Sequence, residues 1–222
     1  MTSSESTVDH SRATIEYIYS TAEASHTESY LWPVVMKQLS FHSKGCGVFD
    51  LGCGNGAFVR HLSTAGYEVV GVDPSATGIA ISREEFPECD VHIGSAYDNL
   101  ATQFGQFDSV VSLEVVEHVY NPRHFARTVS ELLKPGGTAI ISTPFHGYWK
   151  NLSLALTGKL DRHFTVLWDH GHIKFWSVKT LSELLREAGF ENIAFDYAGR
   201  VYPFSKSMIA IARKPLDSIR KQ

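Results

Sequence analysis

The sequence predicts an α/β fold, in which helices cover both faces of a mostly parallel sheet of seven strands. Short apolar runs of strand type alternate with segments of helical spacing from residue 47 onward, and such alternation forms right-handed βαβ units. A glycine-rich turn joins the first run to its helix, as in α/β folds that bind a ligand beyond the strand ends. The final two runs have no helix between them, so we expect the last strand to be antiparallel.

Each element is expected where its periodicity begins and ends. The strands are expected at residues 47–52, 67–73, 89–95, 107–114, 138–144, 192–199 and 207–214. Helices are expected at 57–66, 75–86, 121–137 and 177–190, and two stretches of helical content, 13–20 and 28–39, precede the first strand. The expected N-caps are Ser75, Asn121 with Pro122 after it, and Ser177, and the expected helix stops are Gly66, Pro135 and Gly189.

The composition is that of one globular domain and excludes several classes of protein. The chain has 222 residues, of which 43% are hydrophobic and 20% charged, and its formal net charge is −4. The negative charge argues against a nucleic-acid binder, and no apolar run approaches the ~20 residues of a membrane-spanning helix. The polar start of the chain does not resemble a secretory signal, so we expect a cytoplasmic protein. The three cysteines lack a C-x-x-C pair and are expected to be reduced.

The stretch "VFDLGCGNG" places three glycines within five residues after the first strand. Gly52, Gly54 and Gly56 permit positive φ and remove Cβ atoms, so a ligand can lie against bare backbone at a helix N-terminus. The spacing is one residue shorter than the dinucleotide fingerprint, which disfavours an oxidoreductase. Asp50 precedes the turn and suits a cationic ligand. Asp73 ends the second strand, where a carboxylate can accept hydrogen bonds from ribose hydroxyls.

A ligand with an adenosine end and a cationic amino-acid end is S-adenosylmethionine, and the motifs resemble those of enzymes that use it. "VFDLGCGNG" looks like the first motif of the seven-stranded class I methyltransferases, "VVGVDPS" is similar to their second motif, and "LLKPGGTAIISTP" resembles their fifth-strand region. The resemblance covers about residues 46–214. It implies a Rossmann-like fold and S-adenosylmethionine as the cofactor.

The resemblance also implies roles for individual residues around the donor. Asp50 and Gly52 would lie near the methionine end, with Gly54 and Gly56 in the same loop, and Asp73 would hold the ribose. The residues implied for the adenine are Ser95 and Ala96, and those implied for the methyl-donor pocket are Leu113 and Glu114.

A cluster of ionisable residues, "SLEVVEHVYNP", follows the fourth strand. Glu114, Glu117 and His118 share one face if the segment is helical. Two carboxylates and an imidazole can bind a divalent ion, and the hard oxygens favour magnesium. The string resembles the "E-x-x-E-H-V" stretch of the O-methyltransferases of ubiquinone biosynthesis, in which these three positions are assigned to magnesium. A metal-free role of His118 as a base or substrate-orienting residue, and a purely structural role, are the alternatives.

The chain is expected to form a single domain with four segments. Residues 1–45 form an N-terminal helical lid segment, 46–144 the cofactor-binding core, 145–176 a substrate-lid insert, and 177–222 the C-terminal helix and strand pair. The insert is longer than usual connections and combines basic with aromatic residues. It is expected to cover the acceptor, with peripheral membrane contact or plain packing as alternatives. Its histidine pair, His170 and His172, is not expected to bind zinc.

We therefore expect an S-adenosylmethionine-dependent methyltransferase with His118 as its catalytic residue. The expected reaction is O-methylation of a small or prenylated hydroxylated (phenolic) acceptor. An N- or C-methyltransferase of a small metabolite and a non-catalytic regulatory protein that binds S-adenosylmethionine are the alternatives. The expected partner is a small-molecule acceptor and not a nucleic acid, and the sequence leaves the oligomeric state open.

Overall fold

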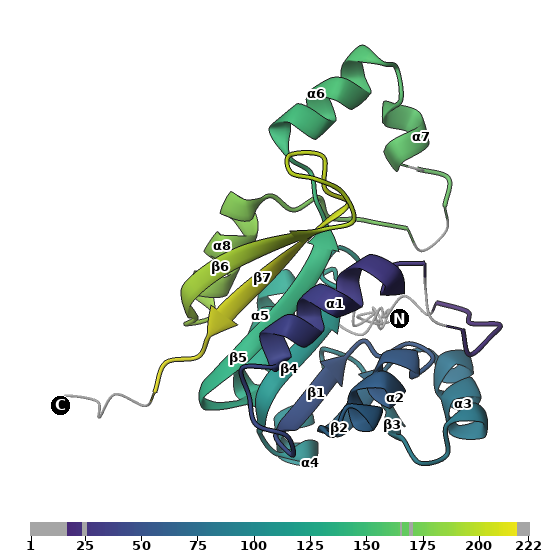
Figure 1. Ribbon diagram of the computed structural model, residues 1–222, viewed down its shortest axis with the longest axis vertical. Coiled ribbons are helices and arrows are strands. Elements are labelled where there is room, and N and C mark those ends of the chain that lie inside the picture. The colour runs from purple at the N-terminus through teal and green to yellow at the C-terminus, as the bar shows by residue number, and fades with distance from the viewer. Residues whose placement is uncertain (1–16, 24–25, 165, 169–170, 217–222) are drawn as a thin grey trace, which may run out of the picture.

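One sheet of seven strands forms the centre of the computed structural model, which describes residues 17–23, 26–164, 166–168 and 171–216 (Figure 1). The strand order is β3-β2-β1-β4-β5-β7-β6. The first five strands in this order are parallel, and β7 is antiparallel to both of its neighbours. The predicted Rossmann-like sheet with an antiparallel last strand is confirmed. The strands are β1 (Gly47–Leu51), β2 (Glu68–Asp73), β3 (Asp90–Ile93), β4 (Phe107–Leu113), β5 (Leu133–Pro144), β6 (Glu191–Ala198) and β7 (Ser207–Arg213).

Helices cover both faces of this sheet, and each face has its own hydrophobic cluster. Leu31 of α1, Leu62 of α2 and Ile79 of α3 belong to one buried cluster, whereas Phe125 of α5 and Leu181 of α8 belong to the other. The helices are α1 (Glu28–Leu39), α2 (Ala57–Thr64), α3 (Ala76–Glu85), α4 (Leu100–Phe104), α5 (Pro122–Leu132), α6 (Tyr148–Leu156), α7 (Leu160–Phe164) and α8 (Val178–Glu187).

The predicted caps hold the helices at their expected starting points. Ser75 and Asn121 each accept a hydrogen bond at 3.1 Å from a backbone N–H three residues on. Ser177 forms a capping box with Thr180. Gly189 follows the last helix with a φ of +87°, a conformation that glycine adopts without strain. Local side-chain chemistry therefore sets these boundaries, as predicted.

Some elements differ from the sequence-based prediction. The helix that begins at Pro122 ends at Leu132, and β5 starts at once because Leu133 pairs with Phe107 ahead of a register shift. The short helix α4 was not predicted. Residues 17–20 form no helix, and residues 13–16 lie outside the described residues.

The insert contains two helices, α6 and α7, in a segment for which the sequence predicted no helix. Both helices stand clear of the sheet, above the end of β5 in the view of Figure 1. No side chain of either helix is fully buried. Among the described residues, no helix is both long enough and apolar enough to cross a membrane.

Candidate active site

The candidate site lies at the carboxyl ends of β1, β2 and β4. The strand order reverses between β1 and β4, which are neighbours in the sheet. In open α/β sheets, ligands bind outside the strand ends at such a switch point. The glycine loop, residues 52–56, leads from β1 into α2 at this place.

The three glycines of the loop all have positive φ, at +89°, +57° and +77°. Each of them lies against a different side chain. A Cβ atom at Gly52 would lie 2.4 Å from a Val115 methyl group, and one at Gly56 would lie 1.9 Å from the Ser82 hydroxyl. These two glycines therefore let the loop pack against the protein itself. A Cβ atom at Gly54 would collide with the side chain of Tyr19, a residue from the N-terminal segment.

Asp50, next to last in β1, is a buried carboxylate with an unsatisfied atom. Its side chain is 2% exposed, and its Oδ2 has no hydrogen-bond partner among the described residues. Burial, and secondarily the charge of Asp73, raises the pKa of Asp50 to about 8. Such a group is stabilised by a ligand that brings positive charge or hydrogen-bond donors.

Asp73 ends β2 and fastens the glycine loop. Its Oδ2 accepts a hydrogen bond from the Gly54 N–H at 2.8 Å, and its Oδ1 accepts one from the Ser75 N–H, also at 2.8 Å. Burial raises the pKa of Asp73, although these two hydrogen bonds oppose the shift. Each carboxylate oxygen has lone-pair capacity for a further donor.

An N-terminal strap, residues 17–23, lies across the loop. The Asn55 amide donates hydrogen bonds to the Thr21 and Glu23 carbonyl oxygens, both at 2.8 Å. The Ser75 hydroxyl donates to the Tyr17 carbonyl oxygen at 2.5 Å. Tyr19 is largely buried there, and burial together with the charge of Asp73 raises its pKa. A lid was expected in this region, but Tyr19 and Asn55 were not among the expected site residues.

The residues expected at the adenine lie beyond the end of β3. The Ser95 N–H donates to Asp98 at 2.7 Å, and the Ala96 carbonyl oxygen accepts from Thr128 at 2.8 Å, so the backbone of this turn is held in place. Ile93 pairs in register with Asp73 and is 57% exposed. An exposed apolar side chain beside Asp73 is a further candidate contact that sequence analysis missed.

Glu114 directly follows Leu113 at the end of β4 and has an unusual backbone. Its φ is +56°, a conformation that costs energy for a residue other than glycine and that concentrates at functional sites. Its carboxylate accepts hydrogen bonds from Ser142 at 2.8 Å and from Ser207 at 3.4 Å. Burial raises the pKa of Glu114 to about 7, against these hydrogen bonds and the charge of Lys150.

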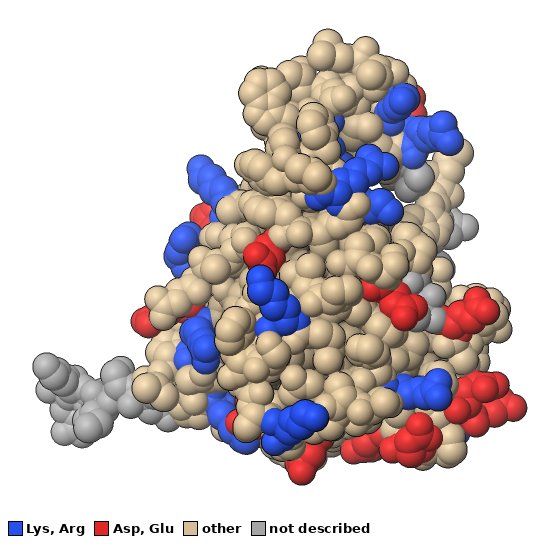
Figure 2. Space-filling view, in the orientation of Figure 1, with Lys and Arg blue, Asp and Glu red and all other residues tan. Residues whose placement is uncertain are grey.

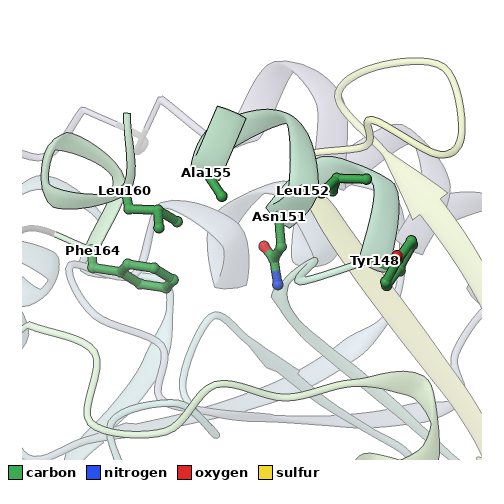
Figure 3. A pocket seen from close by; sticks show the side chains of 6 residues that line it. All are labelled: Tyr148, Asn151, Leu152, Ala155, Leu160 and Phe164. Atoms are coloured by element: carbon green, nitrogen blue, oxygen red, sulfur yellow. The ribbon is translucent and has the colours of Figure 1, made fainter. Parts of the chain in front are cut away.

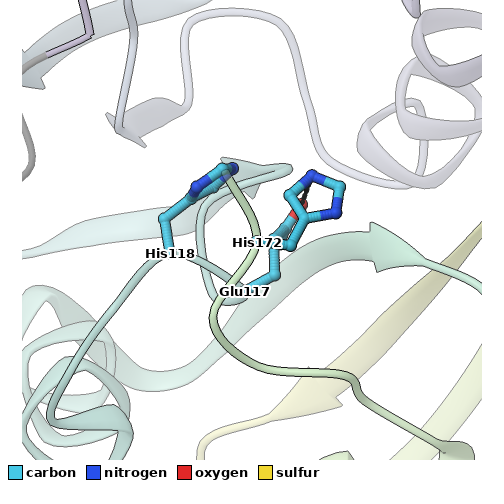
Figure 4. A group of neighbouring side chains, drawn as sticks. All are labelled: Glu117, His118 and His172. Atoms are coloured by element: carbon cyan, nitrogen blue, oxygen red, sulfur yellow. Dashed lines mark ion pairs between the residues drawn. The ribbon is translucent and has the colours of Figure 1, made fainter. Parts of the chain in front are cut away.

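The segment after Glu114 is a turn, so the predicted helical face does not form. Among the described residues, the group of potential metal ligands is Glu117, His118 and His172, whose ligand atoms lie within 4.8 Å of one another (Figure 4). Glu114 is outside this group, and His172, from the insert, stands in its place. Burial, then the charge of His118, lowers the pKa of His172 to about 4. His170 lies outside the described residues.

The aromatic residues of the insert do not line one common pocket. Trp176 belongs to the main core and donates from Nε1 to the Val116 carbonyl oxygen at 3.1 Å. Tyr148 and Trp149 are 72% and 60% exposed. A groove of about 380 Å³ lies between α6 and α7 and is almost entirely apolar (Figure 3). Its lining residues are Tyr148, Asn151, Leu152, Ala155, Leu160 and Phe164.

Comparison with known proteins identifies the family. The family described as the methyltransferase domain matches residues 24–194 of the chain, which include the glycine loop and the Glu117 turn. The chain belongs to this methyltransferase family. The resemblance to class I enzymes that use S-adenosylmethionine, stated from the motifs, is thereby confirmed.

The methyltransferase has curated relatives and solved neighbours. A ubiquinone biosynthesis O-methyltransferase of Ruegeria pomeroyi is 33% identical over 67% of this chain and 61% of its own length. A ubiquinone biosynthesis O-methyltransferase of Dinoroseobacter shibae is 31% identical over 72% of this chain and 64% of its own length. The chain thus spans less than two thirds of these relatives. A methyltransferase structure from Methanosarcina mazei, with a TM-score of 0.63 and 20% identity, covers 84% of this chain and 99% of its own and shows the same fold.

Proposed function

We propose that this methyltransferase transfers the methyl group of S-adenosylmethionine to the hydroxyl oxygen of a phenolic acceptor. The observation that carries the proposal is the buried Asp50 carboxylate beside the glycine loop, with one oxygen that lacks a partner. The ammonium group at the donor's methionine end would compensate this buried charge. Transfer to oxygen is supported by the names of the curated relatives, which are O-methyltransferases.

The remaining donor contacts follow the strand ends. Asp73 would accept hydrogen bonds from the ribose hydroxyls with the lone pairs that the loop leaves available. Ser95 and Ala96, in the turn after β3, would flank the adenine. Leu113 and Glu114 would line the methyl end of the donor, because they lie at the end of β4 beside the switch point.

The reaction is a displacement at the methyl carbon. The acceptor oxygen forms a bond to this carbon while the carbon–sulfur bond breaks, and the donor leaves as the neutral thioether S-adenosylhomocysteine. The phenol has an ordinary pKa of about 10, so a base that takes its proton makes it a better nucleophile. We assign this role to His118, in the turn after β4. Alignment of oxygen, methyl carbon and sulfur supplies much of the remaining acceleration.

The insert would receive the acceptor, and its shape suits a prenylated one. The α6–α7 groove offers an apolar surface that would bury an isoprenoid tail (Figure 3). The insert also exposes Trp149 and Leu156 and carries Lys159 and Arg162. Figure 2 shows basic side chains around this part of the molecule. Aromatic and basic residues together favour contact with an anionic membrane surface, where a prenylated acceptor resides.

Two measurements test the proposal. Calorimetry with S-adenosylhomocysteine is expected to show one donor site per chain. Incubation with S-adenosylmethionine and a panel of phenols, amines and activated carbon acids, followed by product mass, is expected to show methylation of the phenols. Methylated amines without methylated phenols would overturn the O-transfer, and absence of donor binding would overturn the whole proposal.

A further inference from the structure

The Glu117 carboxylate is buried without compensation in the turn after β4. Its side chain is 1% exposed, and neither Oε1 nor Oε2 has a hydrogen-bond partner among the described residues. A carboxylate in such a place destabilises a protein unless a cation or a set of donors meets it.

The imidazole rings of His118 and His172 lie near this carboxylate, and backbone hydrogen bonds fix the position of the chain next to His172. The Glu117 carbonyl oxygen accepts hydrogen bonds from the Ile173 N–H at 3.0 Å and the Lys174 N–H at 2.9 Å. These bonds hold the backbone beside His172, whose Nε2 lies 3.9 Å from Glu117 Oε1 (Figure 4). The His118 and His172 ring centroids are 4.9 Å apart. A contact of 3.9 Å is too long for a hydrogen bond, so His172 leaves the carboxylate unsatisfied.

The donor set does not fit the magnesium expected from the sequence. Magnesium requires near-octahedral oxygen ligands, whereas this group offers one carboxylate and two imidazoles. Glu114, which would have supplied the second carboxylate, is instead bonded to Ser142 and Ser207. Two histidines and one glutamate are the three protein ligands of some catalytic zinc sites, in which water takes the fourth position, and they also suit related transition-metal ions.

We infer that Glu117, His118 and His172 bind a borderline divalent cation, of which Zn²⁺ is the representative, in preference to Mg²⁺. Around a tetrahedral ion with ligand bonds of ~2.0–2.1 Å, ligand atoms are about 3.4 Å apart. The ligand atoms of the group lie within 4.8 Å of one another, so binding would require the side chains to move closer together. Three protein ligands leave a fourth position for water or another oxygen ligand. The ion would cross-link the insert to the β4 turn. The proposed donor site does not depend on this inference, but a His118 that binds the ion cannot also take the proton of the phenol, so the role of base assigned to it above applies to the metal-free protein.

Metal content and affinity test the inference on the full chain. The protein is stripped with a chelator, incubated with Zn²⁺ or Mg²⁺ alone, desalted and analysed for metal, and the affinities are measured by calorimetry. The wild type is expected to retain about one Zn²⁺ per chain and no Mg²⁺. His172→Ala is expected to weaken Zn²⁺ binding at least ~100-fold, because it removes a direct ligand, whose loss costs more than that of an outer-shell group. His124→Ala, a partly exposed histidine on α5 outside the group, is the matched control and should bind like the wild type.

A second variant separates a ligand from a structural side chain. Glu117→Gln keeps the shape of the side chain but removes the buried charge. It is expected to abolish Zn²⁺ retention and, at the same time, to raise the unfolding temperature of the metal-free protein. Zinc is expected to raise the unfolding temperature of the wild type and not that of either ligand variant. A wild type that retains no zinc, variants that retain it fully, or magnesium bound as tightly as zinc would each overturn the inference.

Discussion

The hydroxyl oxygen of Tyr19 lies 2.4 Å from the position that a Cβ atom at Gly54 would occupy. The strap is therefore in direct contact with the glycine loop, at the strand ends where we propose that the donor binds. We expect the strap to cover a donor bound there, so the hydrogen bonds that hold the strap should govern the rate of release.

Loss of the strap's anchor should speed donor release. Asn55→Ala removes two hydrogen bonds to the strap, each worth about 1 kcal/mol. We expect the dissociation rate of S-adenosylhomocysteine in stopped-flow measurements to rise up to about 30-fold, and amide hydrogen exchange at residues 17–23 to accelerate. Asn99→Ala, next to α4, is the control, because its side chain bonds only locally to Thr102. Equal release rates for the two variants would mean that the strap does not gate the donor.

Donor affinity should depend on Asp73. Asp73→Ala removes the acceptor of two ribose hydrogen bonds, together roughly 2–4 kcal/mol, or about 30- to 1000-fold in affinity. Calorimetry with S-adenosylhomocysteine measures the loss. Asp90→Ala, at the start of the neighbouring strand β3, is the control. Asp73 also holds the glycine loop in place. A thermal unfolding measurement must therefore show that the variant is folded before its affinity is compared with that of the wild type. A folded variant with wild-type affinity would exclude Asp73 from the donor site.

The stability of the ligand-free protein should fall as the pH rises, because of Asp50. Its pKa is 3.8 in the unfolded chain and about 8 in the folded protein, so the folded state binds the proton more tightly. The stabilisation is complete below pH 4 and is lost progressively as the pH rises to 8. Asp50→Asn removes this penalty. We expect the variant to match the wild type near pH 4 and to be more stable near pH 8, by up to ~5 kcal/mol.

Denaturant unfolding of both proteins across this pH range checks the prediction. The same variant should bind the donor more weakly, since it lacks the charge that meets the ammonium group. A constant difference in the free energy of unfolding at all pH values would show that Asp50 does not titrate as its burial implies.

The α6–α7 groove should select for a prenyl tail. Leu152→Ser places a hydroxyl in the groove and removes apolar contact, at a cost of about 1–2 kcal/mol of tail binding. We expect KM for a prenylated phenol to rise about tenfold, with no change for the same phenol without a tail. Leu156→Ser, on the same helix but 79% exposed and outside the groove, is the matched control. Equal effects of both variants on both substrates would place the tail elsewhere.

The order of strands and helices could be predicted because its signals are local. Short apolar runs and helical patterns, the caps at Ser75, Asn121 and Ser177, and the glycine stops act within a few residues of chain, and the structure contains them where expected. The two helices of the insert, α6 and α7, were missed. In α6, Tyr148, Leu152 and Ala155 recur at helical spacing, but this face lines the groove toward α7 and does not pack on the sheet.

The sequence by itself determined the α/β fold, the position of the glycine loop and the methyltransferase family, because these depend on residues close together in the chain. Only the tertiary structure decided that His172 of the insert, and not Glu114, joins Glu117 and His118. It also decided that Gly52 and Gly56 make room for Val115 and Ser82. The residues that meet in each case are far apart in the sequence and come together only because the chain between them folds into the sheet and its helices. The spacing of residues along the sequence does not predict these contacts, because packing of the whole sheet and its helices determines them.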